Sequence, residues 1–230
     1  MTTSRTWHDP AYLAYLQAIT ICNPEHLAEC VRATGARRTE GLSRELRWPG
    51  YVGTNYDKVP IRILCVAQVH HGPILAETGQ GIQNILRRIC ADGASPALAG
   101  QLAREYEKVV ALWGPWVKFT KVLRGIDLAL ATPAAVAYVN VAKCWQDPTE
   151  ASRENCRLPM RTCQAFYPLS KLRQAVKADV VLVLSTSSTL GYAGVPKAEW
   201  LFNFPGRPSD AYLAEVAVQV RDFLRASRSN

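Results

Sequence analysis

Four short apolar runs divide the chain and predict the strands of a sheet. They occupy residues 61–67, 136–142, 178–184 and 200–204. The first three are rich in Val, Leu and Ile and lack a strict alternation of polar and apolar residues, which is typical of strands buried on both faces. Polar turns follow these runs, so each strand has a predicted end.

Between the runs, apolar residues recur at the intervals typical of helices. Ile82, Ile85, Leu86 and Ile89 form a stripe with the i, i+3, i+4, i+7 pattern of an amphipathic helix. Comparable stripes predict helices over 10–33, 98–113, 119–126, 166–176 and from Asp210 onward. Cys22-Asn23-Pro24 interrupts the first of these helices. Residues 34–60 carry several glycines and prolines and are expected to be mostly irregular.

Strands that alternate with helices predict an α/β protein. The expected architecture is a three-layer α/β/α sandwich around a mostly parallel four-stranded sheet. A length of 230 residues fits one domain over 1–230. Because the strands are parallel, the loops after 61–67, 136–142 and 200–204 are expected to meet at the carboxyl edge of the sheet.

Composition narrows the classes of function. The net charge of +8 and the pI near 9.2 favour a polyanionic partner. No apolar run reaches the roughly 20 residues of a membrane span, and the polar start lacks a signal segment, so we expect a cytoplasmic protein without a membrane partner. Seven cysteines in that compartment indicate metal binding or burial rather than disulfides. Cys65 lies inside a predicted strand and is expected to be a core thiol.

Polar side chains follow three of the strands. They are Gln68, His70, His71, Asn140, Lys143, Arg207 and Ser209. Together they predict a site for a flat, hydrogen-bonding ligand that lies near phosphates. The structural alternative is that Asn140 only ends its strand and that the histidines are solvated turn residues.

Three motifs resemble those of the uracil-DNA glycosylase superfamily, in its iron–sulfur branch. The most specific is Asn140-Val141-Ala142-Lys143-Cys144, followed by a loop, Cys163, a helix and a strand. The second is Ala67-Gln68-Val69-His70-His71 with Thr78-Gly79 downstream. The third is Phe204-Pro205-Gly206-Arg207-Pro208-Ser209. The resemblance spans about residues 20 to 210.

This resemblance implies a monomeric DNA-repair enzyme that hydrolyses the N-glycosidic bond of uracil or a related deaminated base flipped out of DNA. The catalytic residues it implies are Gln68, Asn140 and Arg207. The substrate-binding residues it implies are His70, His71, Ile82, Lys143 and Ser209. The positions that depart from the family include Gln68, which replaces its glutamate, Ile82, which replaces its stacking aromatic, and Arg207, which replaces its histidine.

The resemblance also implies a [4Fe–4S] cluster. Its ligands would be Cys22, Cys30, Cys144 and Cys163, with Cys156 as the competitor for the last position. Four thiolates suit such a cluster, and they also suit a structural zinc ion, which is the lesser alternative.

Two other functions stay open. A non-catalytic, cluster-bearing nucleic-acid-binding protein of the same fold is favoured by Arg207 and Ile82, which replace the family's histidine and aromatic. A nucleotide-binding α/β protein for small molecules is a weaker alternative, because the chain lacks a glycine-rich phosphate loop.

Overall fold

The apolar runs form a sheet in the computed structural model, which describes residues 5–20, 49–67, 76–141, 161, 163–185, 197–205 and 207–229. The five strands are β1 (Tyr51–Val52), β2 (Ile63–Ala67), β3 (Ala137–Asn140), β4 (Val180–Leu184) and β5 (Leu201–Phe204). Their order across the sheet is β1-β3-β2-β4-β5. Strands β3, β2, β4 and β5 are parallel, and β1 pairs with β3 in antiparallel fashion. Every residue of β2, β3 and β4 is buried, as their continuous apolar sequences predict.

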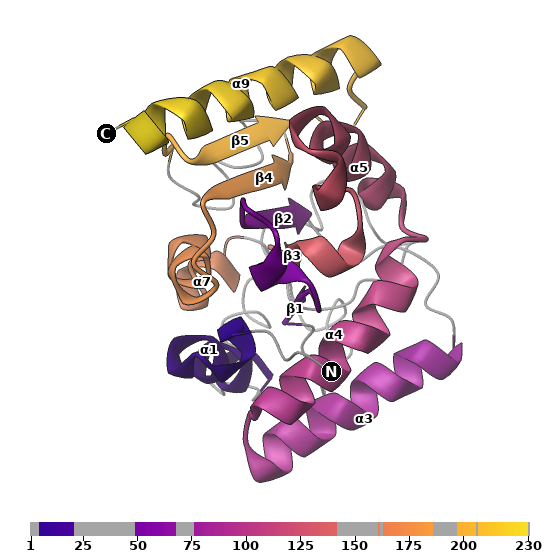
Figure 1. Cartoon of the computed structure of the whole chain (residues 1–230). Helices are drawn as coiled ribbons and strands as arrows, with labels where there is room; N and C mark the ends of the chain where they lie inside the picture. The colour runs from indigo at the N-terminus through magenta and orange to yellow at the C-terminus, as the bar shows by residue number, and fades with distance from the viewer. Residues whose placement is uncertain are drawn as a thin grey trace.

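Helices flank this sheet on both sides (Figure 1). They are α1 (Pro10–Thr20), α3 (Ala76–Asp92), α4 (Pro96–Val110), α5 (Gly114–Ile126), α7 (Leu169–Ala175) and α9 (Asp210–Ser229). Short 3₁₀ turns are η1 (Arg5–His8), η3 (Tyr56–Lys58), η4 (Leu128–Leu130) and η5 (Pro133–Ala135). None of the described helices is both long and apolar enough to cross a membrane.

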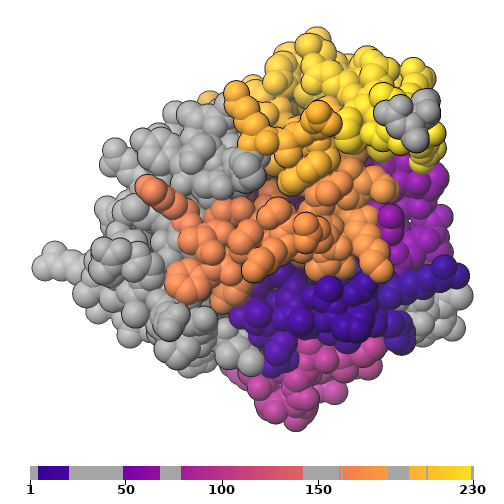
Figure 2. Space-filling view, turned by 90° about the vertical axis from the view of Figure 1, so that its left-hand side faces the viewer, coloured from indigo at the N-terminus to yellow at the C-terminus, as the bar shows by residue number. Residues whose placement is uncertain are grey.

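The strand order explains why the helices occupy opposite faces. Strands β3 and β4 lie on opposite sides of β2, so the two crossover connections run in opposite directions across the sheet. Right-handed crossovers then place α5 and α7 on opposite faces. Helices α1 and α7 share one side of the sheet in Figure 1, with α4 and α5 on the other. On the surface, α7 lies between α1 and α9 (Figure 2).

The predicted α/β class and the four parallel strands are confirmed, but the expectation of a four-stranded sheet was wrong. The fifth strand, β1, comes from the segment 34–60 that was expected to be irregular. Two residues are too few to show a period in the sequence. They form a strand because Tyr51 and Val52 pair with Tyr138 and Ala137 of β3.

Aromatic side chains fill the space between the sheet and α5. The ring of Tyr138 in β3 lies 6.4 Å from Tyr51 and 6.0 Å from Phe119, between ring centroids. Phe119 in turn contacts Phe204, the last residue of β5, at 5.4 Å in an edge-on arrangement. Such pairs add to the free energy of burying the rings. The cluster therefore ties the ends of β3 and β5 to one helix.

Gly50 allows the chain to enter β1. Its φ angle is +83°, and a Cβ at this position would overlap the carbonyl oxygen of Tyr138.

We expect Gly50→Ala to lower the free energy of unfolding by at least about 2 kcal/mol, because it adds backbone strain to a steric clash. Urea denaturation measures this loss. The matched control is Gly114→Ala, since a Cβ at Gly114 meets no atom within 4 Å. Equal stabilities of the two variants would contradict this account.

Glu107 on α4 holds the turn that follows β1. Its carboxylate accepts hydrogen bonds from the backbone N–H of Thr54 (2.7 Å) and from the Thr54 hydroxyl (3.3 Å). Burial nevertheless raises the pKa of Glu107 above its ordinary value, although the bonds from Thr54 and the charge of Arg104 oppose this effect. The folded state therefore binds this proton more tightly than the unfolded state does.

The raised pKa of Glu107 gives a pH dependence with a defined sign. Its contribution to stability is present below the unfolded pKa and is lost as the pH rises through the folded pKa. Glu107→Gln keeps an acceptor and removes the titration. The unfolding free energy of the wild type should fall relative to this variant as the pH rises from acidic values, about pH 4, through the raised pKa of Glu107. Chemical denaturation across that range tests it, with the exposed Glu199→Gln as control. A pH profile shared by both variants would exclude this role.

Candidate functional site

Four parallel strands end together at one edge of the sheet, which we call the carboxyl edge. The last residues are Ala67 of β2, Asn140 of β3, Leu184 of β4 and Phe204 of β5. The register pairs Ala67 with Asn140 and Leu184 with Phe204. The chain passes from β3 on one side of β2 to β4 on the other. Ligands of open α/β sheets bind beside such a reversal, so this edge is the candidate site.

Asn140 is the best-positioned polar residue at this edge. Only 1% of its surface is exposed. The backbone around it is fixed, because the N–H of Val141 donates to the carbonyl oxygen of Ala67 at 2.9 Å. Strand alternation places Asn140 on the same face as Tyr138, the face covered by Phe119 of α5. The predicted site residue therefore carries a pre-oriented amide, and a ligand that bonds it must replace the contacts that bury it.

Three further polar residues were not predicted from the sequence, and two of them lie in or next to the strand ends. Ser185 follows β4 and is 2% exposed. The side-chain nitrogen of Asn203 in β5 donates to the carbonyl oxygen of Ser185 at 3.3 Å. Gln164, 8% exposed, lies in the helical residues 163–166. The sequence features that could have predicted Ser185 and Asn203 are a serine directly after an apolar strand and an asparagine within one. Asn140 was predicted from a feature of the same kind.

Arg207 and Ser209 lie between β5 and α9, on the chain that leaves the carboxyl edge. Arg207 is exposed and forms no hydrogen bond or ion pair with any residue that the structure describes. Ser209 has a structural role as the N-cap of α9: its hydroxyl accepts from the N–H of Tyr212 at 3.2 Å. The start of α9 is held to α5 by the ion pair of Lys121 with Asp210, at 2.6 Å.

Ile82 is not an exposed residue of the carboxyl edge, where Asn140, Arg207 and Ser209 lie. It lies on α3 with no exposed surface and belongs to the hydrophobic core. Stacking of a ligand on Ile82 would need a change in this packing. Gln68, His70, His71 and Lys143 lie outside the described residues. Of the eight predicted catalytic and substrate-binding residues, the structure thus places Asn140, Arg207 and Ser209 at the carboxyl edge.

Cys163 is the one predicted cluster ligand among the described residues; Cys22, Cys30, Cys144 and Cys156 lie outside them. It is completely buried. The pKa of Tyr15 on α1 is raised well above its ordinary value, mainly by burial and further by neighbouring groups that include Cys163. Cys163 is therefore near α1, which ends at Thr20, two residues before Cys22 in the sequence. Within the described part of the chain, no three His, Cys, Asp or Glu side chains are grouped as a metal site.

The other two described thiols differ in their surroundings. Cys65 in β2 is fully buried, and burial raises its pKa well above the ordinary value. This confirms the prediction of a core thiol. Cys90, in the last turns of α3, is exposed, and its sulfur lies 3.5 Å from the carbonyl oxygen of Thr20.

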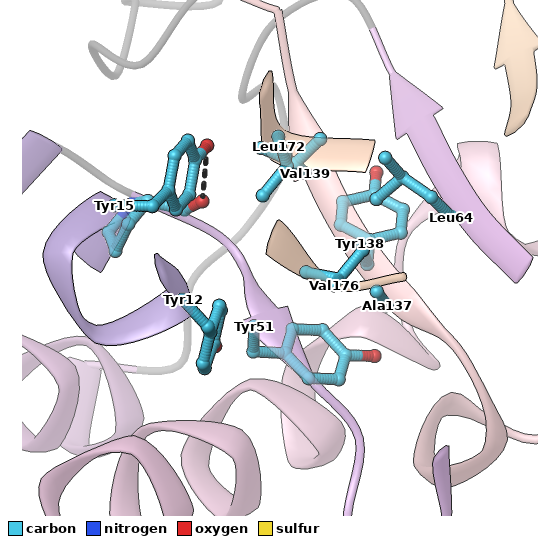
Figure 3. A pocket seen from close by; sticks show the side chains of 10 residues that line it. Tyr12, Tyr15, Tyr51, Leu64, Ala137, Tyr138, Val139, Leu172 and Val176 are labelled. Atoms are coloured by element: carbon cyan, nitrogen blue, oxygen red, sulfur yellow. Dashed lines mark hydrogen bonds between the residues drawn. The ribbon is translucent and has the colours of Figure 1, made fainter. Parts of the chain in front are cut away.

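A cavity lies between the sheet, α1 and α7 (Figure 3). It has a volume of about 10 Å³, room for about one water molecule. Tyr12, Leu172 and Val176 line it, and the nearby hydroxyl of Tyr15 donates to the carbonyl oxygen of Pro49 at 3.5 Å. The cavity is too small for an organic ligand and is a packing feature.

No protein-family model, curated protein or solved structure matches this chain.

Proposed function

We propose that this protein is a DNA glycosylase with a three-layer fold like that of the uracil-DNA glycosylases. It removes uracil or a related deaminated base from DNA by hydrolysing the N-glycosidic bond. The observation that carries this proposal is the position of Asn140, a buried amide fixed at the end of β3 beside the strand-order reversal. Arg207, which follows β5, supports it, because it is exposed and forms no hydrogen bond or ion pair with the described residues.

Asn140 suits the recognition of a uracil edge. Its amide oxygen accepts a hydrogen bond from N3–H of the base, and its amide nitrogen donates to O4. Cytosine presents the opposite donor and acceptor pattern at these atoms, so the same amide orientation discriminates against it. Burial strengthens this discrimination, because a complex that leaves a buried polar group without a hydrogen-bond partner is destabilised.

Arg207 suits the departing base. When the glycosidic bond breaks, uracil leaves as an anion, and a guanidinium near O2 stabilises this charge. A guanidinium is a strong hydrogen-bond donor that does not shuttle a proton, so the contribution of Arg207 is electrostatic. Gln68, which follows β2 in the sequence, would complete the set by orienting the base or the attacking water.

A non-catalytic DNA-binding protein of the same fold is the second candidate. The specific observation in its favour is the burial of Ile82, because no exposed aromatic side chain stands at that position to stack on a base. In this case Arg207 would contact a phosphate instead of a leaving base.

The thiols fit a structural [4Fe–4S] cluster. Cys163 is buried near α1, and Cys22 follows the end of that helix by two residues. Cys22, Cys30, Cys144 and Cys163 would hold the cluster, with Cys156 as the alternative to Cys163 and zinc as the lesser metal. The cluster would supply a cross-link between α1 and the chain that precedes α7.

Iron content tests the role of Cys163. Anaerobically purified protein should be yellow-brown with a broad absorption near ~400 nm, and Cys163→Ser should lose iron and colour. Cys65→Ser is the matched control, because Cys65 is equally buried but lies inside β2. Iron quantification and absorption spectra provide the readout. A colourless wild type, or a coloured Cys163→Ser variant, would remove Cys163 from the ligand set.

Base release tests the proposed function. Under single-turnover conditions with uracil-containing oligonucleotides, Asn140→Ala and Arg207→Ala should each lower the rate by roughly 10²-fold or more, because each removes a group that would bind the base or its departing anion. Alkaline cleavage of the abasic product measures the rate. Arg207→His restores the residue of the resembled family and should retain more activity than Arg207→Ala.

The control for these variants is Arg221→Ala, an exposed arginine in the middle of α9. It removes the same charge without changing the carboxyl edge, and it should leave the rate unchanged. A wild-type protein that binds DNA but releases no base from uracil, hypoxanthine or xanthine substrates would refute the enzyme and leave the second candidate.

A further inference from the structure

Helices α3 and α4 form an antiparallel pair with a polar outer face. Their buried sides carry Ile82, Ile85, Leu86 and Ile89 on α3 and Leu98, Leu102, Tyr106 and Val109 on α4. The outer side carries exposed arginines at Arg87 and Arg88 of α3 and Arg104 of α4. We call these three residues, with the neighbouring Asn84, Gln101 and Lys108, the hairpin face.

Neutral amides orient two of the arginines. A guanidinium nitrogen of Arg87 donates to the side-chain oxygen of Asn84 at 3.2 Å. Arg88 donates across the helix pair to the side-chain oxygen of Gln101 at 3.0 Å. Each guanidinium has five N–H groups, so most of its donors still point to solvent. The two side chains are thereby held in place while their charge stays unneutralised.

Carboxylates do not compensate this charge. None of the three arginines forms an ion pair with a carboxylate in the described part of the chain. Arg104 only influences the half-buried Glu107 of its own helix at a distance. Glu105 is paired with Lys108 at 2.7 Å. The hairpin face therefore keeps the net positive charge of three guanidinium groups.

We propose that the hairpin face binds the phosphate backbone of a nucleic acid, here DNA. Arginine, asparagine and glutamine are among the side chains that contact phosphate oxygens. A membrane surface or a protein partner would need apolar anchors beside the charges. The large exposed apolar residues of the described chain include none on α3 or α4.

The position of the face relates it to the carboxyl edge. Helix α3 follows β2, so its first turn is on the side of the carboxyl edge and its axis leads away from it. Arg87 lies roughly 16 Å along the helix from Ala76, at 1.5 Å per residue. The hairpin face thus extends the binding surface along DNA held at the carboxyl edge. This inference rests on the proposed function for its choice of DNA, but not on base removal.

The salt dependence of binding tests this inference. We compare the wild type with the triple variant Arg87→Gln, Arg88→Gln, Arg104→Gln on an undamaged duplex oligonucleotide. If three phosphate contacts are lost, the slope of log affinity against log salt concentration should decrease in magnitude by about 2 to 3. The control is Lys171→Gln, Lys197→Gln, Arg221→Gln, which removes the same charge from exposed sites on α7, before β5 and on α9. Its slope should stay within about one unit of the wild type.

Circular dichroism and thermal unfolding confirm that both triple variants fold. Equal slopes for the two variants would overturn the inference. So would a hairpin variant that binds DNA normally but no longer pellets with phosphatidylserine vesicles, since the face would then bind membranes.

Base release at saturating protein separates this inference from the proposed function. The hairpin variant should retain the wild-type rate, because its substitutions lie away from the carboxyl edge. If the wild type releases no base but the two triple variants still differ in slope as expected, the glycosylase proposal is refuted. The inference that the hairpin face binds DNA then still holds.

Discussion

Strand β2 is the element on which the rest of the structure depends, because it pairs on both sides and is buried on both faces. Backbone groups in this position cannot reach water, so every one needs a partner in β3 or β4. The pairing begins at the amino edge, where the N–H of Asp179 donates to the carbonyl oxygen of Arg62 at 2.8 Å and the N–H of Arg62 donates to the Asp179 carboxylate at 2.8 Å. An ion pair between the two side chains, at 3.5 Å, reinforces this link.

This pairing also sets the geometry of the carboxyl edge. Since side chains alternate along a strand, a shift of β3 by one residue against β2 would turn Asn140 to the opposite face and Tyr138 out of its aromatic cluster. The cost of moving Tyr138 therefore protects the orientation of Asn140. In the same way, Phe119 packs against Phe204 and fixes the point from which the chain continues toward Arg207. Core packing thus positions polar groups that contribute little to the core themselves.

The polar and charged groups divide into two kinds with different physical roles. Asn140 and Ser185 are buried at the strand ends, and in the proposed site short-range hydrogen bonds to such groups would select the ligand. Arg207 and the hairpin face are exposed, where cations act over about a Debye length of 8–10 Å and attract a polyanion without selecting its sequence. An enzyme that acts on a base within DNA needs both, because binding to the backbone must precede recognition of the base.

The sequence by itself determined the α/β class, the four parallel strands and the position of Asn140 at a strand end, because apolar runs and helical stripes are local patterns. It also indicated that Cys65 is a core thiol. Only the tertiary structure decided that Tyr51 and Val52 form a fifth strand and that Ile82 is buried. It also decided that the side chain of Asn203 donates a hydrogen bond to the carbonyl oxygen of Ser185. Each of these depends on contacts between residues distant in the chain. The pairing of two short segments or the burial of one face of a helix is set by what packs against it, and no local pattern encodes that partner.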